Sequence, residues 1–160
     1  METNSLLSIF DTATYTLKTY STMLDIFVFS ILGIMSLMTF TIAFERISFY
    51  KKMNLESYTN KKVLELKMSD RLTIISTIAA NAPYVGLLGT VFGIILTFYS
   101  LGVGGMTDSN AIMMGLALAL KATAFGLIVA IPAIVFHNYL VRRMEVMVAK
   151  WEIRYEDQKN

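Results

Sequence analysis

The sequence contains no cysteine and only one histidine among its 160 residues. Without cysteine, the chain cannot form a disulfide framework, a thiol nucleophile or a thiolate metal site. A single histidine also argues against a clustered metal site. We therefore expect neither a bound metal nor a cofactor.

Charge is scarce as well. Charged residues make up 16% of the sequence, against about a quarter in soluble domains. Hydrophobic residues make up 55%, and the mean hydropathy is +0.56. This composition predicts an integral membrane protein and excludes a soluble enzyme. The basic residues are interleaved with acidic ones, so no concentrated face for nucleic acid exists. No spaced nucleophile, base and acid occur either, and we expect no enzymatic activity.

Three long apolar runs organise the chain. Residues 26–44 and 72–107 are uncharged, and the run 111–141 is interrupted by Lys121 alone. A helix needs roughly 20 apolar residues to span a bilayer. The sequence thus predicts an all-α protein with three transmembrane helices, which we assign to residues 25–46, 74–101 and 111–141. Before them, residues 1–24 read as an amphipathic helix on or entering the membrane surface.

The polar segments set the orientation. We expect a short loop at residues 47–73, a turn at 102–110 and a tail at 142–160, the loop and tail forming helical extensions. The stretch from Arg46 to Arg71, which includes the end of the first span, carries seven Lys and Arg residues and the tail five, whereas the N-terminal segment has only Lys18. The positive-inside rule places the loop and tail in the cytoplasm and the N-terminus outside.

Small and hydroxyl residues form a stripe on each of the last two helices, at steps of four and three. Small residues allow helix backbones to approach closely in a membrane. The residues expected to serve close packing are Gly86, Gly89, Gly93, Ala119, Gly126 and Ala130.

Hydroxyls lie within the same stripes: Thr90, Thr97 and Ser100 on the second helix, and Thr123 on the third. One interpretation is that they hold helices together, or bond to their own helix's carbonyls. The other is that they line a narrow aqueous cavity and relay protons. Because a hydroxyl cannot hold a charge at neutral pH, the titrating carboxylate would then come from a partner chain.

Lys121 is the one charge inside the third run. It lies about 200° around the helix from Thr123, so it points away from the stripe. Snorkelling, or pairing with a carboxylate such as Asp25, explains it better than pore lining. Pro83 and Pro132 are expected to have structural roles, since proline removes a backbone donor and can kink a helix.

Two long motifs resemble a known family. They are APYVGLLGTVFGII at residues 82–95 and GLALALKATAFGLIVAIPAIVFHNYL at residues 115–140, separated by a short turn. They are similar to the second and third transmembrane helices of the ExbB, TolQ and MotA proton-channel family, nearest to ExbB and TolQ. AFERISFYKK at residues 43–52 also resembles the family, more weakly. The resemblance covers roughly residues 26–143.

The resemblance implies a homopentameric ring in the bacterial inner membrane, with a periplasmic N-terminus and a cytoplasmic loop and tail. Such a ring surrounds the single transmembrane helices of two ExbD-like or TolR-like partner chains. A membrane aspartate of the partner takes up and releases protons, and the proton-motive force drives rotation. In the ExbB branch this work energises uptake across the outer membrane through a TonB-like protein. By position, the family's pore threonines fall on Thr90 and Thr123.

One position departs from the family pattern. Where ExbB proteins commonly carry a glutamate in the third helix, this chain has Leu118, and Lys121 follows one turn later. A proton route through that glutamate is therefore not transferable. The leading expectation is an ExbB-type ring; the alternatives are a TolQ-type ring and a purely structural membrane scaffold.

Overall fold

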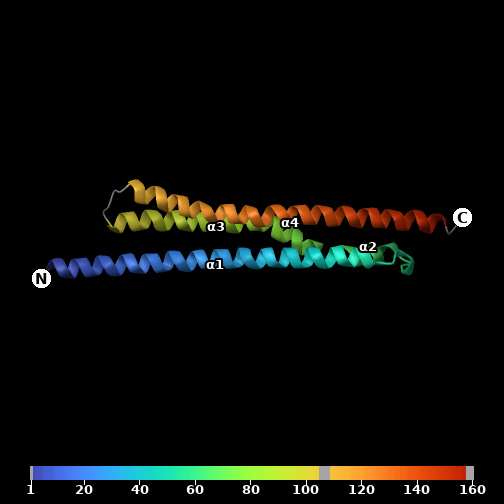
Figure 1. The fold of residues 1–160 in the computed structure, drawn as a ribbon, viewed down its shortest axis with the longest axis horizontal. Helices are drawn as coiled ribbons and strands as arrows, with labels where there is room; N and C mark the ends of the chain where they lie inside the picture. Colours follow the sequence, from blue (N-terminus) through green and yellow to red (C-terminus); the bar gives the residue numbers. More distant parts are fainter. Residues whose placement is uncertain (1, 105–108, 158–160) are drawn as a thin grey trace. The chain divides into compact units, whose positions relative to one another are not determined.

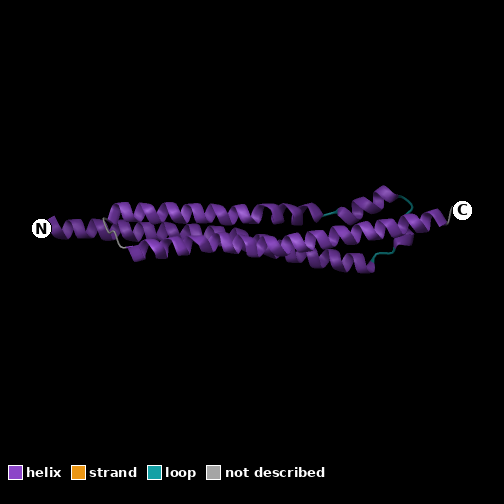
Figure 2. Ribbon diagram, turned by 90° about the horizontal axis from the view of Figure 1, so that it is seen from above, coloured by secondary structure: helices purple, strands orange, loops and turns teal. Residues whose placement is uncertain are grey.

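The structure is a computed structural model that describes residues 2–104 and 109–157. All regular structure in this described part is helical (Figures 1 and 2). The elements are α1 (Glu2–Lys52), the 3-10 turn η1 (Leu55–Ser57), α2 (Lys61–Ser69), α3 (Leu72–Gly104) and α4 (Ser109–Asp157). The predicted all-α class is confirmed for these residues.

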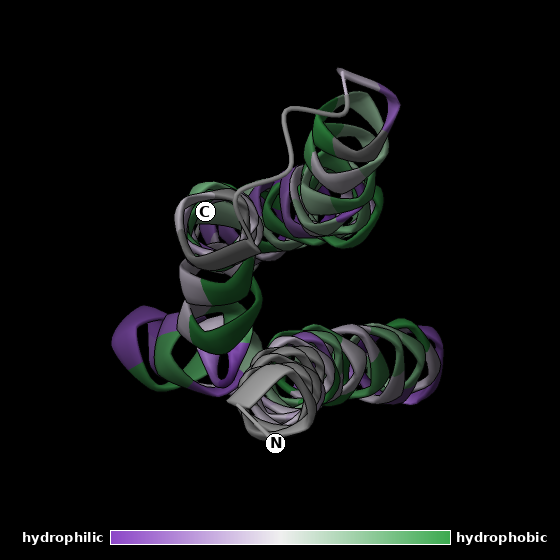
Figure 3. Ribbon diagram, turned by 90° about the vertical axis from the view of Figure 1, so that its left-hand side faces the viewer, coloured by the Kyte–Doolittle hydropathy of each residue, from purple (hydrophilic) through white to green (hydrophobic). Residues whose placement is uncertain are grey.

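Three stretches of the described chain are long and apolar enough to cross a membrane: Thr19–Lys52, Lys61–Ser100 and Ile112–Asp157. Green hydrophobic residues recur on turn after turn of these helices (Figure 3). Only 28 to 33% of each apolar window is buried within the chain. The prediction of three helices with membrane-spanning character is confirmed, and most of their apolar surface is left for lipid or for other chains.

The helices extend further than the apolar runs. α1 continues without interruption through residues 24 and 25, where the sequence suggested a boundary, and α4 continues through the expected tail to Asp157. Once a helix exists, each added residue gains a hydrogen bond, and no proline or glycine stops it at these points. α3 includes Gly102 and Gly104, so the helix occupies the first part of the expected turn. The centre of that turn, residues 105–108, lies outside the described residues, as do residues 158–160.

The chain divides into two compact units, and the first comprises Met1–Ile34 and Ala82–Ile128. Within it, the first part of α1 packs with the second part of α3 and the first part of α4. The rings of Phe29 and Phe125 meet edge to face, with centroids 5.0 Å apart. Its buried apolar residues are mainly small or β-branched: Val28, Leu32, Ala82, Ala119 and Ala122.

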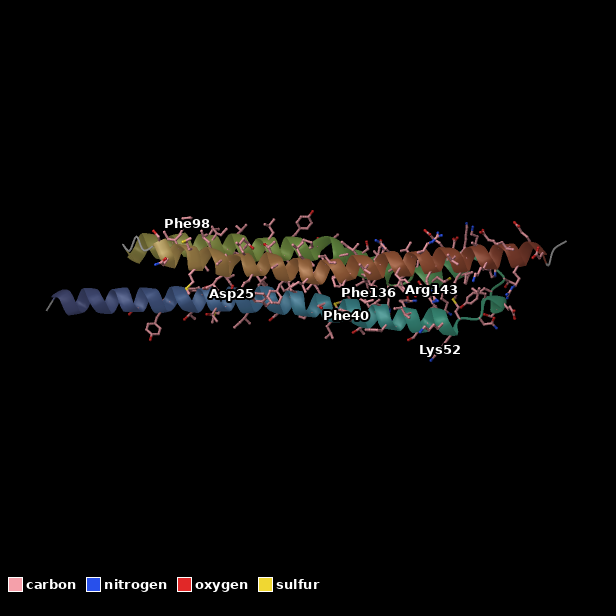
Figure 4. The ribbon with its side chains drawn as sticks, turned by 45° about the horizontal axis from the view of Figure 1, so that its top comes forward. Asp25, Phe40, Lys52, Phe98, Phe136 and Arg143 are labelled. Atoms are coloured by element: carbon pink, nitrogen blue, oxygen red, sulfur yellow. The ribbon has the colours of Figure 1, made fainter. Side chains whose placement is uncertain are left out.

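The second unit comprises Met35–Asn81 and Val129–Asn160. Larger side chains fill its core, including Leu64, Met68, Ile75, Leu140 and Trp151. The rings of Phe40 and Phe136 lie side by side in Figure 4, in an edge-to-face arrangement with centroids 5.5 Å apart. This unit therefore has the packing of an ordinary helical core.

Two ion pairs fix the turn between α2 and α3 to the end of α1. Arg46 is only 5% exposed; its guanidinium pairs with Asp70 and donates to the carbonyl of Lys67 at 3.2 Å. Arg71 pairs with Glu45 at 2.6 Å. Arg71 also has a φ of 61°, a left-handed conformation that a non-glycine residue adopts only at a cost.

Further along, the connection between α1 and α2 is fastened to the end of α4. The indole nitrogen of Trp151 donates to the carbonyl of Tyr58 at 2.8 Å. Arg154 pairs with Glu56 at 2.8 Å, and Glu152 pairs with Lys61. These contacts give the polar loop a defined place in the second unit.

Candidate functional site

In the first unit, α3 and α4 approach so closely that glycine is required at the contact. A Cβ atom added at Gly86 would lie 2.6 Å from the carbonyl oxygen of Ala122. A Cβ added at Gly126 would lie 2.8 Å from the carbonyl oxygen of Ala82. Such distances are far shorter than any Cβ contact tolerates, and both neighbours are backbone atoms that cannot turn aside. The two stripes therefore face each other across a backbone-to-backbone contact.

The same close approach continues along the helices. A Cβ at Gly93 would lie 2.7 Å from Cβ of Ala119, and one at Gly89 would lie 2.7 Å from Cβ of Ala122. Gly89 also faces α1, since its added Cβ would meet Val28 at 3.0 Å. Four of the expected packing glycines thus lie at helix contacts in this unit. Ala130 is also buried, but in the second unit.

Thr90 and Thr123 meet at this contact. Their hydroxyl oxygens are 2.5 Å apart, and Thr90 is 6% exposed. The Thr90 oxygen also lies 3.2 Å from the carbonyl of Ala119 and 3.3 Å from that of Gly86. Because a hydroxyl has one proton, Thr90 can donate to a carbonyl while accepting from Thr123, or donate to Thr123. The pair is a short chain of exchangeable hydrogen bonds that needs no water to satisfy it.

Thr97 and Ser100 are placed differently. Thr97 donates to the carbonyl of Gly93 at 2.8 Å, and Ser100 donates to the carbonyl of Leu96. Both protons are therefore used within α3, which leaves the oxygens as acceptors. These two residues line a cavity of about 380 Å³, bounded by α1, α3 and α4 within the first unit.

Lys121 and Asp25 line the same cavity, together with Ser21 of α1. The two charged groups share the space without an ion pair within 4 Å in the described residues. Leu118, at the position where the family pattern has a glutamate, also lines it. From the helix geometry, Lys121 was expected to point away from the stripe. The structure nonetheless brings it to the same cavity as Thr97 and Ser100, because α1 supplies a third wall that the sequence of one helix does not reveal.

The remaining expected residues are the two prolines. Pro83 and Pro132 are both inside helices, in α3 and α4, and both are half-buried. Among the side chains that the structure describes, no group of three or more histidine and acidic residues could hold a metal ion. The arrangement offers a pair of hydrogen-bonded hydroxyls, and a carboxylate and an ammonium that line one cavity.

Comparison with known proteins gives a consistent result. The family model described as the MotA/TolQ/ExbB proton channel family matches residues 31–153. The chain is 50% identical over 131 residues to the biopolymer transport protein ExbB-like 2 of Helicobacter pylori, covering 82% of this chain and 87% of that protein. It is 46% identical over 130 residues to ExbB of Aquifex aeolicus, covering 81% and 88%. It is 37% identical over 87 residues to TolQ of Pseudomonas aeruginosa, covering 54% and 38%.

Proposed function

Because the chain belongs to the MotA/TolQ/ExbB proton channel family, we propose that it is the ring-forming subunit of a proton-driven motor in the bacterial inner membrane. Five copies form the ring, which encloses the single transmembrane helices of two ExbD-like partner chains. Proton flow through the ring drives the motor, and a TonB-like protein couples this motor to transport across the outer membrane. The alignments of 46 to 50% identity with ExbB and ExbB-like proteins support this branch.

The observation that carries the proposal is the hydrogen-bonded pair of Thr90 and Thr123. Two hydroxyls within hydrogen-bond distance can pass a proton by donating on one side and accepting on the other. Thr90 lies in an uncharged run and Thr123 in a run whose one charge is Lys121, and in these apolar spans the alternative to a relay is a bare proton in a low dielectric. Neither hydroxyl stores charge, so the proton is taken up and released by carboxylates, one of them on the ExbD-like partner.

The exposed surface of the spans supports a ring. More than two thirds of each apolar window is not buried within the chain. Some of the uncovered residues are polar or charged, including Ser100, Asp25 and Lys121, and lipid tails cannot solvate them. Neighbouring copies, partner helices and enclosed water can. The excess of basic residues in the loop and tail favours a cytoplasmic location for both, with the N-terminus in the periplasm.

A structural scaffold is the competing function, and one observation favours it. The hydroxyl of Thr90 is fully satisfied by groups of its own chain, as helix-binding hydroxyls are. In a scaffold, removal of the hydroxyl weakens assembly; in a relay, it stops proton-coupled work while the ring persists.

The test replaces each threonine by valine, which keeps the volume and removes the hydroxyl. We expect Thr123→Val and Thr90→Val to form rings with bound partner in native mass spectrometry. Energised uptake in cells should fall by tenfold or more, which corresponds to about 1.4 kcal/mol in the barrier. Thr123→Ser, which keeps the hydroxyl, should restore most of the uptake.

Thr77→Val is the matched control, since Thr77 lies on the same helix and donates only to the carbonyl of Thr73. It should leave both uptake and assembly unchanged. Wild-type uptake in both pair variants would overturn the relay. Loss of the ring in both, with rescue by serine, would instead establish the scaffold.

A further inference from the structure

The cavity in the first unit is lined by both charged side chains that the structure describes in that unit. Glu2, Asp11, Lys18 and Asp108 have no described side chain, and the charged side chains that remain are Asp25 and Lys121. Both line the one cavity of about 380 Å³, although they come from α1 and α4. Figure 4 marks the position of Asp25 on α1. A carboxylate and an ammonium on separate helices that open into one space form a built polar site.

The surroundings of these charges are suited to water. Thr97 and Ser100 of α3 donate their protons to their own helix, which leaves their oxygens as acceptors for water in the cavity that they line. Ser21 adds a third hydroxyl from α1. A volume of about 380 Å³ is far above the roughly 10–15 Å³ that one water requires. Water is also suited to the two charges, because no ion pair within 4 Å joins them in the described residues and because Lys121, inside the third apolar run, is costly unless paired or hydrated.

We propose that this cavity is a water-filled chamber in which Asp25 exchanges protons with water and Lys121 supplies the balancing charge. In the exchange, the carboxylate of Asp25 takes a proton from hydronium, which leaves a carboxylic acid and a water molecule; the reverse step returns the proton. This exchange rests on the proposed channel function, in which Asp25 would be a residue of the chain itself that binds and releases protons. The hydration and the charge of the chamber do not depend on that function.

The groups that face Asp25 are few. Lys121 faces it from α4, only the hydroxyls of Thr97 and Ser100 face it from α3, and Ser21 lies one turn away on its own helix. Among the described residues lining the chamber, Asp25 is thus the one carboxylate. A change in the chamber's charge on acidification should depend on Asp25 alone.

The absence of cysteine makes the chamber accessible to a direct test. A single cysteine is introduced in the full-length chain in lipid vesicles and treated with small, membrane-impermeant methanethiosulfonates, one anionic and one cationic, on both sides. Thr97→Cys reports on the chamber. Phe98→Cys, the next residue, is 57% exposed and does not line the cavity, so it is the control for a lipid-facing position.

We expect Thr97→Cys to react at least tenfold faster than Phe98→Cys. Adding Asp25→Asn should shift the ratio of anionic to cationic rates upward by about fivefold, and adding Lys121→Met should shift it downward by a similar factor. The ratio should rise on acidification with Asp25 present and stay constant in Asp25→Asn. Comparing the two reagents at one pH cancels the ionisation of the thiol itself.

Equal slow rates at both cysteines would show a dry cavity and overturn the proposal. Unchanged charge selectivity in both charge variants would show that the side chains do not face the chamber, with the same consequence. If Asp25→Asn or Lys121→Met alone prevents insertion into the membrane, the double variant Asp25→Lys with Lys121→Asp is used instead. It keeps one charge of each sign in the chamber and should restore fast labelling of Thr97→Cys. Labelling does not depend on proton transport. If Thr90→Val and Thr123→Val leave uptake unchanged, the proposed hydrated chamber is not affected, and slow labelling would not affect the proposed threonine relay.

Discussion

Replacing Gly86 by alanine tests how tightly the two stripes are packed. The new Cβ would lie 2.6 Å from the carbonyl oxygen of Ala122, and an ordinary contact begins at 3.4 Å, so α3 and α4 must separate by up to 0.8 Å. The same movement stretches the 3.2 Å contact between Thr90 and the carbonyl of Ala119 toward 4.0 Å. Overpacking costs about 1–3 kcal/mol, and an interhelical hydrogen bond in a membrane is worth roughly 0.6–1.7 kcal/mol. Gly86→Ala should therefore destabilise the fold by about 2–4 kcal/mol.

The control is Gly33→Ala, in α1 of the same unit, where an added Cβ has nothing within 4 Å. Both changes add one methyl group to a helix, so any general effect of alanine on helices is common to them. We expect Gly33→Ala to stay within about 0.5 kcal/mol of wild type. The measurement is reversible unfolding of each variant in mixed micelles, followed by circular dichroism. Equal stability of the two variants would refute the close contact between α3 and α4.

Two further perturbations address other contacts. Gly93→Leu should cost more than Gly86→Ala, because even its Cβ would lie 2.7 Å from Cβ of Ala119; a ring of unchanged stability in native mass spectrometry would contradict this. Trp151→Phe removes the 2.8 Å hydrogen bond to the carbonyl of Tyr58, worth about 1 kcal/mol, and should speed hydrogen exchange at residues 55–60. Tyr155→Phe, which keeps the ring stacked on Trp151, is its control and should leave that exchange unchanged.

Local patterns in the sequence were sufficient for much of the fold. Uncharged runs of adequate length identify the three spans, because the bilayer sets one length and one polarity for all of them. The recurrence of Gly86, Thr90 and Gly93 at steps of four and three identifies a helix face. A face rich in small residues is useful only against another such face, and the third span supplies it. For this reason the meeting of Thr90 and Thr123 was within reach of the sequence.

Contacts between segments that are distant in the sequence could not be predicted. Glu45 and Arg46 read as a solvated end of a helix, and Asp70 and Arg71 as part of a charged loop. Nothing in the sequence indicates that Arg46 pairs with Asp70 or that Glu45 pairs with Arg71, because charged side chains on a surface are equally well solvated by water. The chamber escaped prediction for a similar reason: its walls come from three helices, and the angle between Lys121 and Thr123 on one helix says nothing about a third.

The threonine pair and the charged chamber differ in what each can do with a proton. The pair can pass a proton but cannot hold one, whereas Asp25 can hold a proton but lines a separate space with Thr97 and Ser100. A proton that passes the pair must therefore come to rest on a carboxylate at each end. Among its described side chains, the first unit supplies one such carboxylate, that of Asp25. In the proposed channel the second is the carboxylate of the ExbD-like partner, so the channel is complete only in an assembly, and an isolated subunit should conduct no protons.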